Sequence, residues 1–341
     1  MKGRLIALDH LGGAEAAALM VDGRLEDLFL DSDAPRPGAI YRGIVDRPVK
    51  GQGGMFLRTP DGAAFLRQVK GLSPGQPILV QVTGYPEPGK ALPVTAKVLF
   101  KSRYAIVTPD APGLNVSRSI RDDDRRDELL AIAHAEMDGA EMGLILRSSC
   151  EQANDDDIAE DIRAMHDLAQ AVTADADGSD PEKLTEGDGP HALAWREWTA
   201  PAQVDTSEGS FADHGVLDQV EALDSPDVPL GSGASISVEP TRALVAVDVN
   251  TGGDTSPAAG MKANLAAAKD LPRQLRLRGL GGQIVMDLAP MAKKDRRQFE
   301  TSLRAAFRAD IVETTLVGWT PLGHFELQRK RDRMALSEVM K

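Results

Sequence analysis

The pattern of apolar and polar residues predicts several structured regions along the chain. Short apolar runs between residues 5 and 30, with Asp22-Gly23 as a turn, predict a small antiparallel sheet. Between residues 39 and 100, short β-rich runs separated by Asp-Gly and Pro-Gly steps predict a five-stranded barrel of the oligonucleotide-binding type. Residues 101–173 place two helical patterns around the strand-like "MGLILRSS", which predicts a compact mixed α/β unit.

The most regular pattern lies in the last third of the chain. A hairpin is predicted over "ASISVEPTRALVAVDV", then a Gly-rich bend, a helix around 261–279, the strand "QIVMDL" and a helix around 294–308. Two further strands are predicted, "IVETTLVGW" and "GHFELQR". This alternation is typical of an α/β layer on a mixed sheet. Pro272 lies inside the first helical pattern, so we expect a kink or a break there.

The stretch 174–215 differs from its surroundings in composition. It is poor in aliphatic residues and rich in Asp, Gly, Pro and Ser, which predicts a long loop or linker. One helical turn is predicted inside it, at "HALAWREW". No internal repeat is visible in the chain.

Composition sets the class of protein. With 341 residues, 42% hydrophobic and 27% charged, the chain can bury a substantial core and form two or more domains. Its start, "MKGRLIALDH", supports neither a signal peptide nor a membrane span, so we expect a cytoplasmic protein without a membrane partner. The single cysteine, Cys150, excludes an internal disulfide framework and a cysteine cluster for a structural metal.

The charge is unevenly distributed along the chain. A formal net charge of −13 argues against a surface coated with positive charge to grip nucleic acid. Residues 273–333, however, contain thirteen Lys and Arg against seven Asp and Glu. We therefore expect any phosphate-bearing ligand to bind near this C-terminal segment.

Candidate chemistry lies where two predicted strands end. Side chains alternate along a strand, so Asp248 and Asn250 share a face, and Asp287 ends the next strand of the predicted layer. If the two strands are neighbours, Asp248 and Asp287 lie together at one sheet edge and repel each other unless a cation joins them. Mg²⁺ commonly takes one or two carboxylates and keeps several waters. The alternative is that Asp248 caps the following bend and Asp287 caps the next helix.

This region contains the stretches "VAVDVNTGGD", "NLAAAKDLPRQLRLRGLGGQIVMDL" and "GHFELQRKR". They resemble the catalytic core of the bacterial ribonuclease E/G family, and weaker similarity extends over nearly the whole chain. The resemblance implies a multidomain α+β and α/β protein. Its parts would be an RNase H-like subdomain (1–35), an inserted S1 barrel (36–100), a 5′-sensor subdomain (101–173), an acidic linker with a reduced second part of the RNase H-like subdomain (174–230) and a DNase I-like catalytic subdomain (231–341).

The resemblance also implies a reaction and a cofactor. The reaction is endonucleolytic cleavage of single-stranded RNA by a water activated by Mg²⁺, with Mn²⁺ as a substitute, leaving a 5′-phosphate and a 3′-hydroxyl. Asp248 and Asp287 correspond to the family's metal ligands, and Asn250 to an asparagine that orients the scissile phosphate or a carboxylate. Larger members continue into a Cys-Pro-X-Cys zinc link between protomers. This chain has no cysteine after Cys150, so we expect no zinc, and any homodimer would lack that link.

The same resemblance implies RNA-binding residues outside the catalytic strands. Arg147 and Ser148 match the family's pocket for a 5′-monophosphate, where threonine usually stands in place of the serine, and Arg118 is a candidate helper. The alternative for Arg147 is an ordinary surface ion pair. Phe56, Phe65 and Lys90 match the barrel residues that meet RNA, although a strand phenylalanine is often part of a core.

Four basic residues of the C-terminal segment are further candidates for contacts with the RNA backbone. They are Arg276, Arg278, Arg329 and Arg331. A charged helical face needs no ligand, however, so solvent exposure alone is the alternative reading.

Three functions compete at this point. The first is a magnesium-dependent endoribonuclease that prefers single-stranded RNA with a 5′-monophosphate. The second is an RNA-binding protein with weak or no cleavage, which the missing zinc link and the net charge favour. The third, a phosphohydrolase of small substrates, is disfavoured by the barrel.

Overall fold

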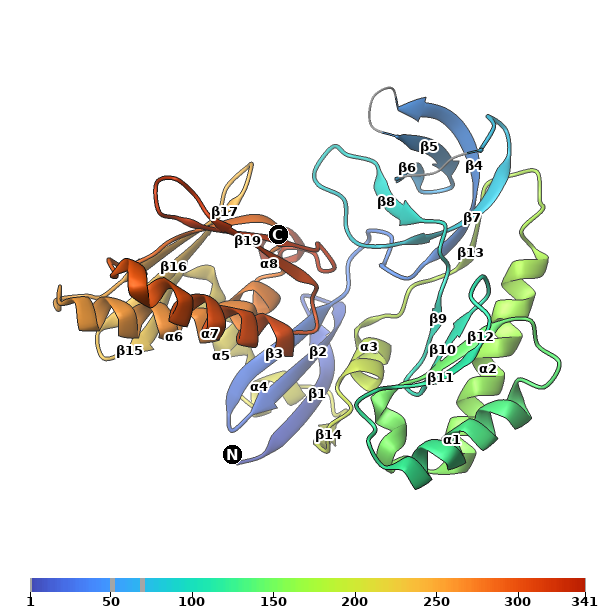
Figure 1. The fold of residues 1–341 in the computed structure, drawn as a ribbon, viewed down its shortest axis with the longest axis horizontal. Coiled ribbons are helices and arrows are strands. Elements are labelled where there is room, and N and C mark those ends of the chain that lie inside the picture. The colour runs from blue at the N-terminus through green and yellow to red at the C-terminus, as the bar shows by residue number, and fades with distance from the viewer. Residues whose placement is uncertain (1, 50–52, 68–70, 341) are drawn as a thin grey trace. The chain divides into compact units, whose positions relative to one another are not determined.

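The computed structural model describes residues 2–49, 53–67 and 71–340. The chain forms two compact units, one combining Met1–Ser32 with Ala202–Lys341 and the other formed by Asp33–Pro201 (Figure 1). The second unit is therefore inserted into the first along the chain. Among the described residues, no helix combines the length and the apolar character needed to cross a lipid bilayer.

The first unit begins with the antiparallel sheet that the sequence predicts. Strands β1 (Arg4–Leu11), β2 (Ala14–Val21) and β3 (Arg24–Leu30) form three neighbouring strands, and β14 (Gln203–Asp205) adds to β1 in parallel. The turn at Asp22-Gly23 is confirmed, with φ angles of 50° and 79°. The sheet packs against α4 (Ser210–Asp213) and α5 (Val216–Glu221), which 3₁₀ helix η2 (Ala222–Asp224) follows.

A six-stranded mixed sheet forms the rest of this unit, in the order β15-β16-β17-β18-β20-β19. The strands are β15 (Asp227–Gly231), β16 (Ala234–Pro240), β17 (Val245–Asn250), β18 (Gly282–Asp287), β19 (Thr314–Trp319) and β20 (Phe325–Arg329). Only the β17–β18 pair is parallel. Helices α6 (Pro257–Leu277) and α7 (Arg296–Ala309) pack on the sheet, and η3 (Lys293–Asp295) and α8 (Leu336–Val339) complete the unit. The predicted hairpin and α/β layer are confirmed.

Pro272 does not break the helix that carries it. Helix α6 continues through this residue to Leu277, and Leu271, Pro272 and Leu275 are all buried. A proline removes one backbone donor and crowds the preceding turn. Burial of the surrounding apolar face against the sheet offsets that cost, so the expectation of a break is wrong.

The second unit contains the predicted five-stranded barrel. Strands β4 (Ile40–Val49), β5 (Gly54–Thr59), β6 (Gly62–Leu66), β8 (Leu92–Thr95) and β7 (Pro77–Val82) pair in that order, and pairing of β7 with β4 closes the barrel. The interior is apolar and includes Leu57, Leu66 and Val80. Alternating residues of the same strands therefore point outward.

The mixed α/β unit predicted after the barrel is also present. Its sheet has the order β11-β12-β10-β9, formed by β9 (Phe100–Lys101), β10 (Ala105–Thr108), β11 (Leu114–Val116) and β12 (Gly143–Leu146). Helices α1 (Asp123–Glu136) and α2 (Asp155–Ala174) pack on it through Leu129, Ile158 and Ile162. The 3₁₀ helix η1 (Ser148–Gln152) follows β12 directly.

The stretch predicted to be a long loop is largely structured. It contains β13 (Glu182–Thr185), which pairs with β4, then α3 (Pro190–Glu197), β14 and α4. Arg42, on β4, donates to the Asp175 carbonyl and to the Glu182 carboxylate, and Trp198 is buried. Polar and aromatic contacts to distant residues hold these short elements, so composition predicted only the helical turn at α3.

We expect the single cysteine to resist thiol reagents in the native protein. Cys150 is fully buried in η1, and burial raises the pKa of its thiol to about 12. The reactive thiolate is therefore scarce and inaccessible at pH 8. Absorbance with a chromogenic disulfide reagent should show slow labelling in buffer and rapid, stoichiometric labelling in denaturant. Labelling of the native protein at the rate of a free thiol would contradict this burial.

Candidate active site

The six-stranded sheet of the first unit has one covered face and one open face. Along β17, Val245, Val247 and Val249 are buried with residues of α6 and α7, whereas Asp248 and Asn250 are exposed. The strand is thus half-buried, and its polar residues lie on the face that the helices leave open. This explains how an apolar run can end with an aspartate and an asparagine two positions apart.

Two aspartates lie side by side on this open face. In the parallel pairing of β17 with β18, Asp248 is directly opposite Asp287, as the alternation and the strand–helix–strand connection predict. Adjacent strands lie about 4.8 Å apart. Both residues are exposed, with 68% of the Asp287 side chain accessible. The Asn250 amide donates to Asp248 Oδ2 at 2.8 Å, which fixes the orientation of that carboxylate.

The capping alternative for these aspartates is not what the structure shows. Helix α6 is capped by Ser256, whose side chain accepts from the Ala259 amide at 3.2 Å. The N-cap positions of η3 and α7 are Ala292 and Asp295. Neither Asp248 nor Asp287 therefore occupies a helix N-cap, and their placement needs another explanation.

A histidine that sequence reasoning missed lies beside the pair. His324 Nε2 is 3.7 Å from Asp287 Oδ1, and 35% of the His324 side chain is exposed. Its backbone amide donates to Thr320 Oγ1 at 3.1 Å, and its carbonyl accepts from the Thr320 amide at 2.8 Å, so the turn before β20 is anchored. Predicting this neighbour would have required the strand order, because the pairing of β20 with β18 is what brings His324 to Asp287.

The donor set on the open face fits a hard cation. Carboxylate oxygens of Asp248 and Asp287 are the ligands that Mg²⁺ prefers, and Mg²⁺ usually keeps several waters. Within the part of the chain that the structure describes, no group of three or more His, Cys, Asp or Glu is arranged to hold a metal. The negative charges of the two neighbouring carboxylates repel each other, and a bound cation would offset that repulsion.

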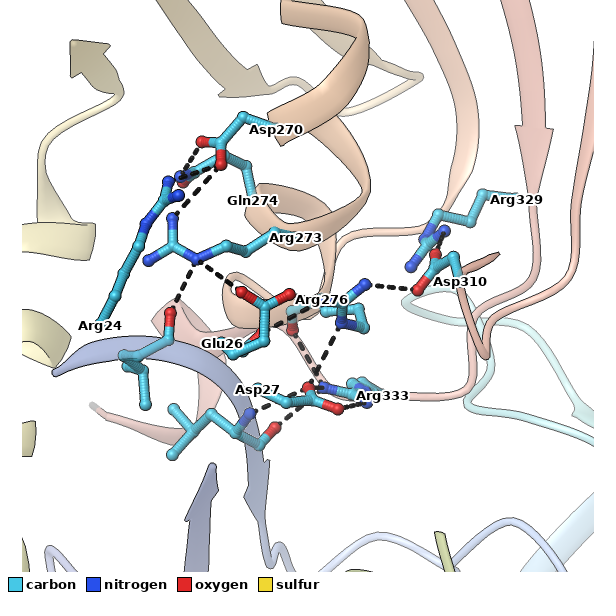
Figure 2. Close-up of polar contacts among 12 residues, drawn as sticks. Arg24, Glu26, Asp27, Asp270, Arg273, Gln274, Arg276, Asp310, Arg329 and Arg333 are labelled. Atoms are coloured by element: carbon cyan, nitrogen blue, oxygen red, sulfur yellow. Dashed lines mark hydrogen bonds and ion pairs between the residues drawn. The ribbon is translucent and has the colours of Figure 1, made fainter. Parts of the chain in front are cut away.

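Two of the predicted RNA-binding arginines are instead part of an internal ion network (Figure 2). Arg276 donates to Asp310 Oδ1 at 2.6 Å and to Glu26 Oε1 at 2.8 Å. Arg329 donates to Asp310 Oδ2 at 2.6 Å. The Asp310 side chain has no exposed surface, and those of Arg276 and Arg329 are 10% and 1% exposed. Both guanidinium groups are thus engaged inside the unit.

The other two predicted arginines, Arg278 and Arg331, differ in how far they are buried. Arg278 is 7% exposed and donates to the carbonyls of Leu223 and Ser225, while Arg331 is partly exposed. Burial lowers the pKa of Arg278, as it does for Arg329. The side chains of Arg276, Arg278 and Arg329 are therefore buried and bound within the unit, and RNA cannot reach them in this arrangement. Arg331 remains a candidate for backbone contact.

The barrel presents its two candidate aromatic residues on the outside. Phe56 and Phe65 are directly opposite on β5 and β6, with ring centroids 5.6 Å apart, and both are half-buried. The Arg47 guanidinium lies 5.3 Å from the Phe56 ring, a neighbour that sequence reasoning missed. Lys90 is 66% exposed and pairs with Glu87 at 2.5 Å. The phenylalanines are thus not part of the barrel interior.

Two residues of the candidate 5′-phosphate pocket, Arg147 and Ser148, follow β12, and Arg118 follows β11, which pairs with β12 in parallel. Ser148 and Arg118 are exposed. Arg147 donates to the Ser102 carbonyl at 2.6 Å, the Arg196 carbonyl at 3.2 Å and Glu197 Oε2 at 2.8 Å. Burial would raise the pKa of Glu197, but the charges of Arg147 and Arg196 outweigh burial and lower it. Arg147 thus forms an ion pair, as the alternative predicts, but its guanidinium is half-buried and firmly oriented by the two carbonyls as well.

Comparison with known proteins adds independent information. The model of the ribonuclease E/G family matches residues 100–203 and 191–332. Ribonuclease E of Nostoc sp. is 27% identical, over 98% of this chain and 56% of its own length, and ribonuclease E of Synechocystis sp. is 28% identical, over 95% and 56%. Ribonuclease G of Salmonella typhimurium is 27% identical, over 96% and 80%. The chain thus spans little more than half the length of the two ribonuclease E relatives.

Proposed function

The chain belongs to the ribonuclease E/G family, and from this premise we propose that it is an endoribonuclease that cleaves single-stranded RNA. The observation that carries the proposal is the pairing of Asp248 with Asp287 on the open face of the sheet. The names of the relatives, ribonuclease E and ribonuclease G, support RNA as the substrate.

The proposed site works with Mg²⁺, for which Mn²⁺ can substitute. Asp248 and Asp287 hold the ion, and Asn250 keeps the Asp248 carboxylate in place through its amide. When bound, the cation lowers the pKa of a coordinated water and neutralises charge on the scissile phosphate. The proposed hydrolysis breaks the P–O3′ bond, which leaves a 5′-phosphate and a 3′-hydroxyl.

The other parts of the chain have proposed roles in holding RNA. We assign the barrel to the S1 type and the unit around β12 to a 5′ sensor. The first sheet is assigned to an RNase H-like subdomain, and the six-stranded sheet to a DNase I-like catalytic subdomain. Phe56, Phe65 and Lys90, with Arg47, offer outward aromatic rings beside positive charge, which is how single strands are commonly bound.

The proposed 5′-phosphate pocket uses Arg147, the hydroxyl of Ser148 and the nearby Arg118. The three bonds that Arg147 makes within the described residues use three of the five N–H donors of a guanidinium. We propose that the remaining donors bind a terminal phosphate. A guanidinium that is already oriented loses little side-chain entropy on binding, which favours recognition of a terminal phosphate.

The function is tested with a labelled single-stranded RNA of about twenty nucleotides, incubated with the protein and Mg²⁺. We expect internal cleavage, dependence on the cation, and new ends that a kinase can label only after phosphatase treatment. The second candidate is an RNA-binding protein with weak or no cleavage, and the observation that favours it is that no third His, Cys, Asp or Glu of the described residues joins Asp248 and Asp287 in a metal-binding group. Tight binding without any cleavage would establish that candidate instead.

Arg147→Gln is expected to abolish a preference for 5′-monophosphorylated RNA. Charge-assisted hydrogen bonds contribute about 1.5–3 kcal/mol, so the ratio of cleavage rates for 5′-phosphate and 5′-hydroxyl substrates should fall by roughly tenfold or more. The ratio is insensitive to the folded fraction, which matters because Arg147 also binds the Ser102 and Arg196 carbonyls. Arg163→Gln, in an exposed ion pair on α2, is the matched control. An unchanged ratio would remove Arg147 from the pocket.

A further inference from the structure

An exposed tryptophan on α3 has no role in the function proposed so far. Trp195 is 62% exposed, whereas Trp198, three residues later, is 5% exposed. Tryptophan is highly buried on average and is enriched at interfaces, so an exposed indole is a candidate contact for a ligand. Trp195 belongs to the "HALAWREW" segment, whose helix is present although its surroundings were predicted to be a linker.

The indole of Trp195 is held by a stacked arginine. The Arg103 guanidinium carbon lies 4.0 Å from the centroid of the Trp195 ring, and Arg103 Nη1 donates to the Trp195 carbonyl. Arg103 Nε is buried and has no hydrogen-bond partner within the described part of the chain. The guanidinium covers one side of the ring, and 62% of the residue remains accessible to solvent. The stack thus presents a flat, preoriented aromatic surface backed by a positive charge.

This stack borders the candidate 5′-phosphate pocket. Arg147 donates to the carbonyls of Ser102 and Arg196, which are the chain neighbours of Arg103 and Trp195. On the other side, Ser149, which follows Ser148, donates its hydroxyl to the Arg103 carbonyl at 2.5 Å. Arg147, Ser148 and the stack therefore lie on three short segments that are bonded to one another, residues 102–103, 147–149 and 195–196.

The charges around the stack favour a nucleic acid over an acidic protein or a lipid. Three carboxylates near the stack are already bound: Glu197 by Arg147 and Arg196, Asp188 by Arg196, and Asp161 by the Ser102 hydroxyl and the Tyr104 amide. Guanidinium and indole groups are the planar surfaces on which unpaired bases stack. An unpaired base therefore matches both the aromatic surface and the phosphate-binding groups next to it.

We propose that Trp195 stacks on the base of the 5′-terminal nucleotide of a single-stranded RNA, next to the phosphate held by Arg147 and Ser148. This inference rests on the proposed function, because it uses the 5′ pocket as the neighbouring subsite. Stacking accepts any base, so Trp195 makes the protein recognise a terminal nucleotide rather than a phosphate alone. The bland alternative is that the Arg103–Trp195 stack only stabilises α3.

The test compares two 5′-monophosphorylated oligonucleotides that differ only in whether the first nucleotide carries a base or is abasic. Binding is measured with Asp248→Asn protein, so that cleavage does not interfere. We expect the base-bearing RNA to bind on the order of tenfold more tightly. Trp195→Ala should remove this difference, and Trp195→Phe should keep most of it. Leu168→Ala, which truncates another exposed apolar residue of the second unit, should leave it unchanged.

The binding experiments give different results if Trp195 does not stack on the base and if Arg147 does not bind the 5′-phosphate. If the base-dependent difference is absent, or persists in Trp195→Ala, stacking by Trp195 is overturned whatever the phosphate does. The phosphate is tested separately by comparing 5′-phosphate with 5′-hydroxyl RNA in wild type and Arg147→Gln. Loss of the base effect in Trp195→Ala alone, with circular dichroism unchanged, supports stacking and excludes a purely structural role for α3.

Discussion

Replacing either aspartate of the open face, as Asp248→Asn or Asp287→Asn, is expected to reduce Mg²⁺-dependent cleavage on the order of a thousandfold. Each substitution removes one of two opposed carboxylates. A bound cation supplies several kcal/mol of charge stabilisation, and each 1.4 kcal/mol is a factor of ten in rate. RNA binding should persist or strengthen slightly, because a negative charge next to the phosphates has been removed. Single-turnover cleavage and equilibrium binding separate the two effects.

The matched control for these variants is a carboxylate of the same face that is not part of the pair. Glu239 is exposed on β16 and lies opposite Ala246 of β17. Ala246 is two residues before Asp248, so Glu239 lies on the same face of the sheet as Asp248. Glu239→Gln should cleave at close to the wild-type rate. Since Asp248 and Asp287 are exposed, all three variants should unfold at similar temperatures. Wild-type cleavage by Asp287→Asn would refute the site, whatever the behaviour of the control.

The geometry of this pair could be predicted from sequence because two local regularities determine it. Alternation along a strand places Asp248 and Asn250 on one face, and a strand–helix–strand connection favours parallel neighbours. Both regularities act over short stretches of chain, so a single sequence contains the information. The distance from His324 to Asp287 depends instead on β20 pairing with β18. That choice is made by packing across the whole sheet.

The positions of the arginines in the basic segment, by contrast, could not be predicted from the sequence. Counting charges from residue 273 to residue 333 indicated a phosphate-binding surface, but Arg276, Arg278 and Arg329 lie inside the unit. The partner of Arg276, Glu26, is 250 positions away in sequence, and no local pattern reports such a contact. A helical arginine facing solvent and one facing a second sheet look the same in the sequence. Charge composition therefore misassigned them.

Asp310→Ala is expected to lower the free energy of unfolding by about 3–5 kcal/mol, because it leaves buried positive charge uncompensated. The Asp310 side chain is completely inaccessible and accepts from Arg276 and Arg329, each at 2.6 Å (Figure 2). Arg276 would keep Glu26 as a partner. Arg329 would lose its carboxylate, and its Nη2 is already buried without a partner among the described residues. Urea unfolding followed by circular dichroism measures the loss.

An ion pair of the same network whose arginine is exposed provides the control. Arg24 pairs with Asp270 at 2.5 Å, but 55% of its side chain is accessible (Figure 2). Arg24→Ala should therefore cost less than about 1 kcal/mol. If Asp310→Ala destabilises the protein no more than Arg24→Ala does, buried charge pairing is not what holds this region together.

A double variant tests the physical reason for the loss. Removing one partner of a buried pair leaves an unpaired charge, whereas replacing both partners with apolar groups of similar size can be nearly neutral. Asp310→Leu combined with Arg329→Met should therefore be more stable than Asp310→Leu alone. Arg329 ends β20, the strand paired with the one that carries Asp287, so the network also supports the open face. Cleavage per folded molecule should accordingly recover with stability in the double variant, whereas Asp287→Asn should stay inactive while fully folded.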